Sequence, residues 1–117
     1  MSVIADFTVP VDRFALKDTL PEVPTVKVEF ERVVSHSQKW VLPFLWVYGD
    51  DLQTFDERTR RDSTVVSATV TDEFSNARLY DIQWSARIKA IINSIFDRDG
   101  TLVEASGSAD SWDISVR

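Results

Sequence analysis

The sequence contains no cysteine, a single histidine (His36) and only three glycines. Without cysteine the chain has no disulfide framework and no thiolate chemistry. A zinc site is disfavoured because its ligands are mostly cysteine and histidine, and His36 lies in a Ser-rich turn with no fixed partner that would make it a general base. The glycines are isolated, so no phosphate-binding loop is present. We therefore expect no catalytic residue, no metal ligand and no cofactor.

Long apolar runs are also missing. No run approaches the ~20 residues that span a bilayer, and the N-terminus has neither the basic region nor the apolar stretch of a signal peptide. These absences predict a cytoplasmic protein without a membrane partner. The length of 117 residues, 44% of them hydrophobic, suits one ordinary domain or two small units that share a core.

Basic residues are scarce, above all lysine. The chain has 19 acidic against 13 basic residues, and its net charge of −6 argues against nucleic-acid binding by electrostatics alone. Asp outnumbers Glu by 13 to 6, and Arg outnumbers Lys by 9 to 4. Short acidic side chains with few lysines are typical of a surface that stays hydrated in high salt, so we interpret the chain as halophilic; the alternative is an ordinary acidic cytosolic protein.

Hydrophobic periodicity predicts a βαββαβ order over residues 3–72. Val3, Ala5, Phe7 and Val9 alternate with polar residues, which indicates a strand with one buried face. The same kind of evidence, with capping aspartates and breaking prolines, predicts the remaining elements. They are helices over 12–20 and 51–61 and strands over 26–30, 40–48 and 66–70.

The same order of elements begins again near Arg78 and ends at Arg117 after a strand, a helix and two further strands. The strands are predicted over residues 80–84, 101–105 and 111–116. The helix, 86–97, has the clearest signal in the chain, because its isoleucines recur at helical spacing behind Ser85, which can cap it. The apolar stripe consists of Ile88, Ile91, Ile92, Ile95 and Phe96.

The predicted fold class is α+β. We expect residues 1–74 to form a ferredoxin-like βαββαβ unit, and residues 75–117 to form a partial second unit that lacks its last helix and strand, with mainly antiparallel sheets and helices on one face. The final strand would then have an unpaired edge and an uncovered apolar face around Trp112 and Ile114. Such an edge recruits another chain. The sequence therefore predicts a homodimer in which the second unit contributes to the interface.

Five aromatic residues are the candidates for a ligand site or an interface. Core packing is the simpler explanation for them. The alternative is an aromatic-lined pocket or a dimer face, because Trp and Tyr combine apolar area with a hydrogen-bond donor. A basic cluster, Arg58 with Arg60 and Arg61, is surrounded by acidic residues and is interpreted as a solvated helix face. The aromatic candidates are Phe44, Trp46, Tyr48, Trp84 and Trp112.

Several segments resemble haloarchaeal bacterio-opsin-activator-like transcription regulators. The resemblance begins with Met1–Pro10, Phe14-Ala15-Leu16 and Val28–Val34, and continues through Pro43–Val47, Asp72-Glu73-Phe74, Arg78-Leu79-Tyr80 and Glu104–Gly107. It covers essentially the whole chain in order and spacing. In that family the corresponding region is associated with GAF domains and precedes a C-terminal helix-turn-helix. No recognition-helix signature is present in residues 1–117, so DNA contact would come through a segment outside them.

The resemblance implies a non-enzymatic sensory or dimerisation domain of a haloarchaeal transcription regulator. Two other classes stay open. One is a small-molecule-binding module similar to ACT-type regulatory domains, with an unknown effector at the junction of the two units. The other is an enzyme similar to ferredoxin-like monooxygenases that need no cofactor, for which a polar cluster around His36 in a closed pocket would be the sign.

Overall fold

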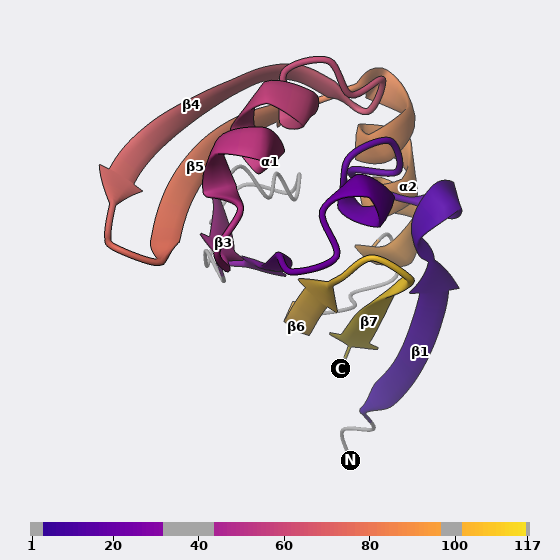
Figure 1. Ribbon diagram of the computed structural model, residues 1–117. Helices are drawn as coiled ribbons and strands as arrows, with labels where there is room; N and C mark the ends of the chain where they lie inside the picture. Colours follow the sequence, from indigo (N-terminus) through magenta and orange to yellow (C-terminus); the bar gives the residue numbers. More distant parts are fainter. Residues whose placement is uncertain (1–3, 32–43, 97–101, 117) are drawn as a thin grey trace.

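The described part of the chain forms one curved, seven-stranded antiparallel sheet with two α-helices (Figure 1). The computed structural model describes residues 4–31, 44–96 and 102–116. The strand order is β1-β7-β6-β2-β3-β5-β4. The elements are β1 (Ala5–Pro10), η1 (Val11–Arg13), η2 (Leu20–Glu22), β2 (Lys27–Phe30), β3 (Phe44–Tyr48), α1 (Leu52–Thr59), β4 (Val65–Glu73), β5 (Ala77–Trp84), α2 (Ala86–Phe96), β6 (Leu102–Gly107) and β7 (Ser111–Val116).

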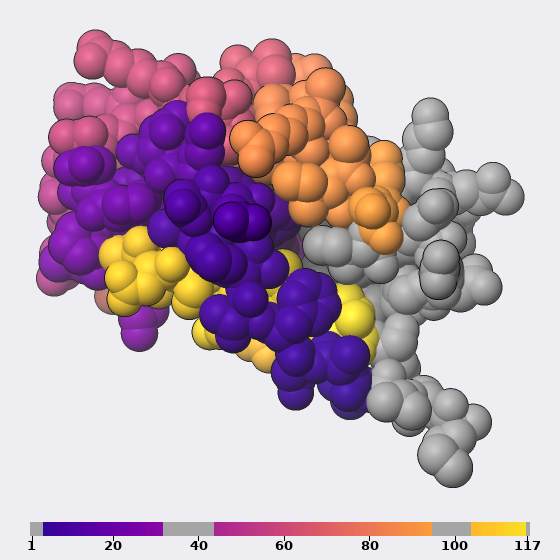
Figure 2. All heavy atoms as spheres, turned by 90° about the vertical axis from the view of Figure 1, so that its right-hand side faces the viewer, coloured from indigo at the N-terminus to yellow at the C-terminus, as the bar shows by residue number. Residues whose placement is uncertain are grey.

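The hydrophobic core lies on the inner face of this sheet, which carries α1, α2 and residues 11–23. Alternation in β2 and β3 turns Val28, Phe30, Leu45 and Val47 into the core, where each is at most 3% exposed. Figure 1 shows α1 inside the curve formed by β3, β5 and β4. In Figure 2 the indigo N-terminal part of the chain lies beside the orange α2 and across the yellow C-terminal strands. The opposite, outer face of the sheet carries no described helix.

Both α-helices bury the faces that periodicity predicts. Leu52, Phe55 and Thr59 of α1 are buried, as expected from their spacing. Ile88 and Ile92 of α2 are at most 2% exposed, and the Ser85 hydroxyl accepts the backbone N–H of Ile88 at 3.4 Å, as an N-cap does. The side chains of Ile95 and Phe96, which also belong to the predicted stripe, are not among those that the structure describes.

The predicted helix over residues 12–20 is wrong. This segment instead forms η1, a run of turns and η2. Side chains from the loop after α1 take the backbone N–H groups that a helix would use internally: Leu16 N–H donates to the Thr64 hydroxyl at 2.9 Å, and Asp18 N–H donates to the Asp62 carboxylate at 3.0 Å. Leu16 has a positive φ of 59°, which ends any right-handed helix there.

The final strand is neither unpaired nor uncovered, which corrects the expectation on which the dimer interface rested. β7 lies between β6 and β1, and its register pairs Ile114 with Phe7 and Trp112 with Val9. Trp112 is fully buried and Ile114 is 3% exposed. The predicted buried face of the first strand is also wrong, because β1 is an edge strand whose residues are mostly exposed.

The ferredoxin-like arrangement is not confirmed, although the mixed α+β class is. The strands of residues 1–74 do not form a sheet of their own: β1 and β4 lie at opposite edges and pair with β7 and β5. Close-range hairpins explain this order, since β4–β5 and β6–β7 are each joined by a short turn. The division into units 1–74 and 75–117 stays a prediction. Residues 40–43 of the strand predicted over 40–48 lie outside the described residues.

Candidate functional site

The structure separates the five aromatic candidates into two groups. Trp84 and Trp112 are at most 1% exposed and belong to the core. Phe44, Trp46 and Tyr48 lie on the outer face of β3, where Phe44 and Trp46 are half-buried and Tyr48 is exposed. The five residues therefore do not form one site, because β3 presents its aromatic side chains on the face opposite to the core.

The two core tryptophans are linked through Phe30. The Phe30 ring stacks on Trp112 at a centroid distance of 5.1 Å and meets Trp84 edge-on at 5.6 Å. The indole N–H of Trp112 donates to the Ala15 carbonyl at 2.9 Å, so its polar atom is satisfied. Core packing, the simpler explanation considered for these residues, is what the structure shows for Trp84 and Trp112.

An aromatic strip lies on the outer face where β3 ends, beside the turn between β4 and β5; we define it as Trp46, Tyr48 and Phe74. The rings of Trp46 and Tyr48 are nearly parallel, 17° apart with centroids at 6.2 Å, and the centroid of the Phe74 ring lies 6.0 Å from that of Trp46. Tyr48 is 41% and Phe74 is 58% exposed. Isolated apolar side chains are normal on a surface, but three adjacent rings on a sheet face that no described helix covers are typical of an interaction surface.

Carboxylates surround the aromatic strip on the outer face. One row of cross-strand partners crosses all seven strands with Trp46 in it, and none of its members is buried. The row runs Thr8, Asp113, Ser106, Glu29, Trp46, Leu79 and Asp72. Partial burial and the negative charges of Glu29 and Glu31 raise the pKa of Tyr48. The outer face therefore combines the aromatic strip with carboxylates on the neighbouring strands.

Sequence reasoning missed Phe74 as a member of this site. It follows β4 at the turn into β5, where its N–H donates to the Ala77 carbonyl at 2.8 Å. A phenylalanine in a turn beside Ser75 and Asn76 is unexpected, since turns favour polar residues. This exception to the usual turn composition was the sequence signal that could have identified Phe74 as a surface aromatic residue.

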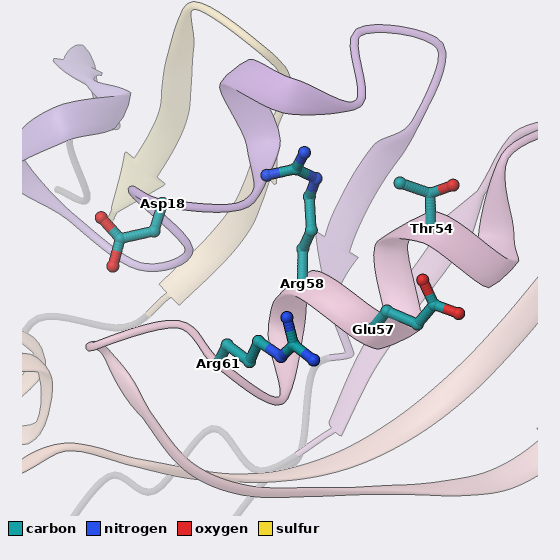
Figure 3. Close-up of a pocket in the computed structure, with 5 residues that line it drawn as sticks. All are labelled: Asp18, Thr54, Glu57, Arg58 and Arg61. Carbon is teal, nitrogen blue, oxygen red and sulfur yellow. The ribbon is translucent and has the colours of Figure 1, made fainter.

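A second candidate site is an open depression beside α1 (Figure 3). Its volume is about 430 Å³, and its lining residues are Asp18, Thr54, Glu57, Arg58 and Arg61. In Figure 3 the two guanidinium groups lie between Asp18 and Glu57. Hydrogen bonds from the Ser63 hydroxyl and N–H lower the pKa of Asp18. Among the described residues neither guanidinium has an ion pair, whereas Arg60 is paired with Asp56 at 2.9 Å.

Polar side chains between α1 and the sheet hold the two together through hydrogen bonds. The Tyr80 hydroxyl donates to Asp56 at 2.8 Å, and Arg60 donates to the same carboxylate and to the Ala68 carbonyl. Burial raises the pKa of Tyr80 to about 12. Burial alone would raise the pKa of Asp56, but hydrogen bonds from Arg60 and Tyr80 outweigh it and lower the pKa. Each group has a partner, so this cluster fastens α1 to β5 and β4.

The described ranges hold no cluster of three or more His, Cys, Asp or Glu side chains suited to a metal ion. None of the helices in those ranges is long and apolar enough to cross a bilayer. His36, on which the monooxygenase alternative depends, lies outside the described residues.

Comparison with known proteins decides the family. The family model described as "BAT: GAF and HTH_10 associated domain" matches residues 3–117. The chain belongs to this family. The BAT domain is found in bacterio-opsin activator-like regulators, as the resemblance in the sequence indicated. No curated protein and no solved structure matches the chain.

Proposed function

We propose that this BAT domain is a non-enzymatic sensory and dimerisation domain of a cytoplasmic transcription regulator from a halophilic archaeon, and that DNA is contacted by a helix-turn-helix outside residues 1–117. The observation that carries the proposal is the family match over residues 3–117, to a domain associated with GAF and helix-turn-helix modules. The net charge of −6 supports it, because a domain of this sign does not bind the phosphate backbone by itself.

The regulatory role is tested in a regulator that contains a BAT domain together with its helix-turn-helix. Deleting the BAT domain is expected to leave operator binding by the helix-turn-helix in place and to abolish the change in reporter transcription that the inducing condition produces. A reporter response that is unchanged without the BAT domain would contradict the proposal.

Dimerisation is proposed to use the open edge of β1. Phe7 on this strand and Ile4 just before it are 36% and 51% exposed, and the second edge of β1 has no partner within the described chain. Edge strands of this kind pair with other chains. Light scattering at micromolar concentration in high salt is expected to give the mass of two chains for the wild type and of one chain for Phe7→Lys. A monomeric wild type would contradict this part of the proposal.

A second candidate function is binding of a small anionic effector in the depression beside α1. The observation that favours it is the pair of guanidinium groups of Arg58 and Arg61, which are without an ion pair in the described structure and can together hold a carboxylate or phosphate. A panel of small carboxylates and phosphates should raise the thermal midpoint of the wild type but not of the Arg58→Gln, Arg61→Gln double variant. Equal shifts in both proteins would argue against a site there.

A further inference from the structure

The aromatic strip lies in a face whose charge is almost entirely negative. Along the strands, exposed side chains on this face alternate with the buried ones that form the core. Lys27 is the lysine among them, at the end of β2 opposite Tyr48. The exposed carboxylates of the face are Asp6, Glu29, Asp72, Asp81, Glu104 and Asp113.

This charge distribution decides between occupants of the face. A second copy placed face to face would oppose carboxylates to carboxylates, and juxtaposed like charges cost several kcal/mol in an interface. Nucleic acid is disfavoured for the same reason. An occupant with many Lys and Arg side chains gains binding free energy in two ways. Its cations can form ion pairs with Glu29, Asp72 and Asp113. Its cations and their alkyl stems can also pack on the rings of Trp46 and Tyr48.

We propose that the aromatic strip and its acidic surround bind a basic helix-turn-helix domain, the module that the family description names beside this one. This inference rests on the proposed function and names the partner of the outer face. A helix-turn-helix binds DNA with a surface rich in Lys and Arg that contacts phosphates. The outer face offers the same surface a competing set of negative charges. Docking on the BAT domain and binding to DNA are therefore mutually exclusive. The BAT domain lowers DNA binding by the helix-turn-helix because it occupies the surface that contacts DNA.

The direct test is a binding measurement between two purified proteins. The 117-residue chain is titrated into a fluorescently labelled HTH_10-type helix-turn-helix domain taken from a regulator of this family, and anisotropy is followed at the lowest KCl concentration at which circular dichroism shows both proteins folded. The wild-type chain is expected to bind the labelled domain saturably, with a Kd that rises with salt concentration. Unlabelled operator DNA should displace the chain from the labelled domain.

Charge-reversal variants locate the binding surface. Glu29→Lys with Asp113→Lys is expected to weaken binding at least tenfold. Asp12→Lys with Glu22→Lys makes the same change in net charge on exposed residues of η1 and η2, which lie on the inner side of the sheet. That control should bind within about twofold of wild type. Equal weakening by the two pairs, or absence of saturable binding by wild type, would overturn the proposal.

A third variant tests the aromatic strip itself. Phe74→Ser changes a side chain that is 58% exposed at a turn, so the fold should survive, as a thermal melt can verify. It is expected to weaken binding at least fivefold, and unchanged affinity would refute the role of the strip. These measurements involve no transcription and no inducing signal. Failure of the reporter experiment therefore leaves their outcome unaffected, and failure of binding leaves the regulatory role to be judged by the reporter.

Discussion

Trp112 lies across Gly107, its cross-strand partner in the β6–β7 hairpin. A Cβ atom placed on Gly107 would be 2.7 Å from Cε2 of the Trp112 indole, closer than real side chains approach. The indole is fully buried, stacked on Phe30 and hydrogen-bonded to Ala15, so it cannot swing away without breaking those contacts. The absent side chain at Gly107 is therefore a requirement of core packing.

We expect Gly107→Ala to destabilise the protein by about 1–3 kcal/mol, the usual cost of overpacking a filled core. Denaturant unfolding followed by tryptophan fluorescence measures the loss. Ser106→Ala, the neighbouring residue on the outer face, serves as the control and should change the free energy of unfolding by less than about 0.5 kcal/mol. If Gly107→Ala unfolds at the wild-type denaturant concentration, the indole is not held against β6 as the structure has it.

The second prediction concerns Asp62, a carboxylate that is 3% exposed and accepts hydrogen bonds from four donors. They are the N–H groups of Asp18 and Thr64 and the hydroxyls of Thr19 and Thr64. Asn at this position keeps the size but offers one oxygen, so Asp62→Asn leaves donors unpaired and should cost about 3 kcal/mol. Thermal unfolding measures this, with Asp72→Asn on exposed β4 as the control. A loss no greater than in the control would mean that the 62–64 loop does not hold residues 16–19.

The third prediction is a pH dependence from the Tyr80–Asp56 hydrogen bond. Tyr80 has a folded pKa of about 12, against about 10 in an unfolded chain. Its contribution to stability is therefore fully present below pH 10 and is lost as the pH rises through 12. The pKa of Asp56 is lowered in the folded state, so its contribution disappears at the acid end, as the pH falls through that folded pKa. Unfolding free energies measured at alkaline pH should fall more steeply in the wild type than in Tyr80→Phe, and parallel curves would contradict this.

The fourth prediction tests the inward face of α2. Ile92 is 2% exposed, so Ile92→Ala should cost about 2–5 kcal/mol through lost burial and the cavity that remains. Ile91, one position earlier, is only partly buried against the core. Ile91→Ala is the matched control and should cost clearly less in a urea titration. Equal losses at the two positions would indicate that the helix is rotated about its axis.

The fifth prediction is that the protein is stabilised by salt. Raising KCl to the molar range shortens the Debye length to about 3 Å and screens the repulsion of a chain with net charge −6. The thermal midpoint should therefore rise with KCl. Replacing Asp6, Glu29 and Asp113 by Ser, Gln and Ser should reduce this rise, because these carboxylates lie on one face. A midpoint that is flat or falls with KCl would contradict the halophilic interpretation.

Periodicity within single elements was enough to predict most of the strands and both α-helices with their buried faces. Alternation identifies β2 and β5, and the isoleucine stripe identifies α2, because these patterns depend only on neighbours within one element. The sequence also pointed to Trp46 and Tyr48 as candidate interface residues, but it could not separate them from Trp84 and Trp112. Which face of a strand is buried depends on the elements that pack against it, and the sequence of the strand alone does not specify them.

Long-range contacts, which no local pattern encodes, decide the conformation of residues 11–23 and the order of the strands. The partners of Leu16 and Asp18 are Thr64 and Asp62, more than forty positions away along the chain. Local propensity favours a helix there, and hydrogen bonds from distant side chains override it. In the same way β1 pairs with β7, over one hundred positions later, and covers the edge that the sequence alone leaves open. Pairings at such separation follow from the shape of the whole core, because each must satisfy backbone groups that local structure leaves free.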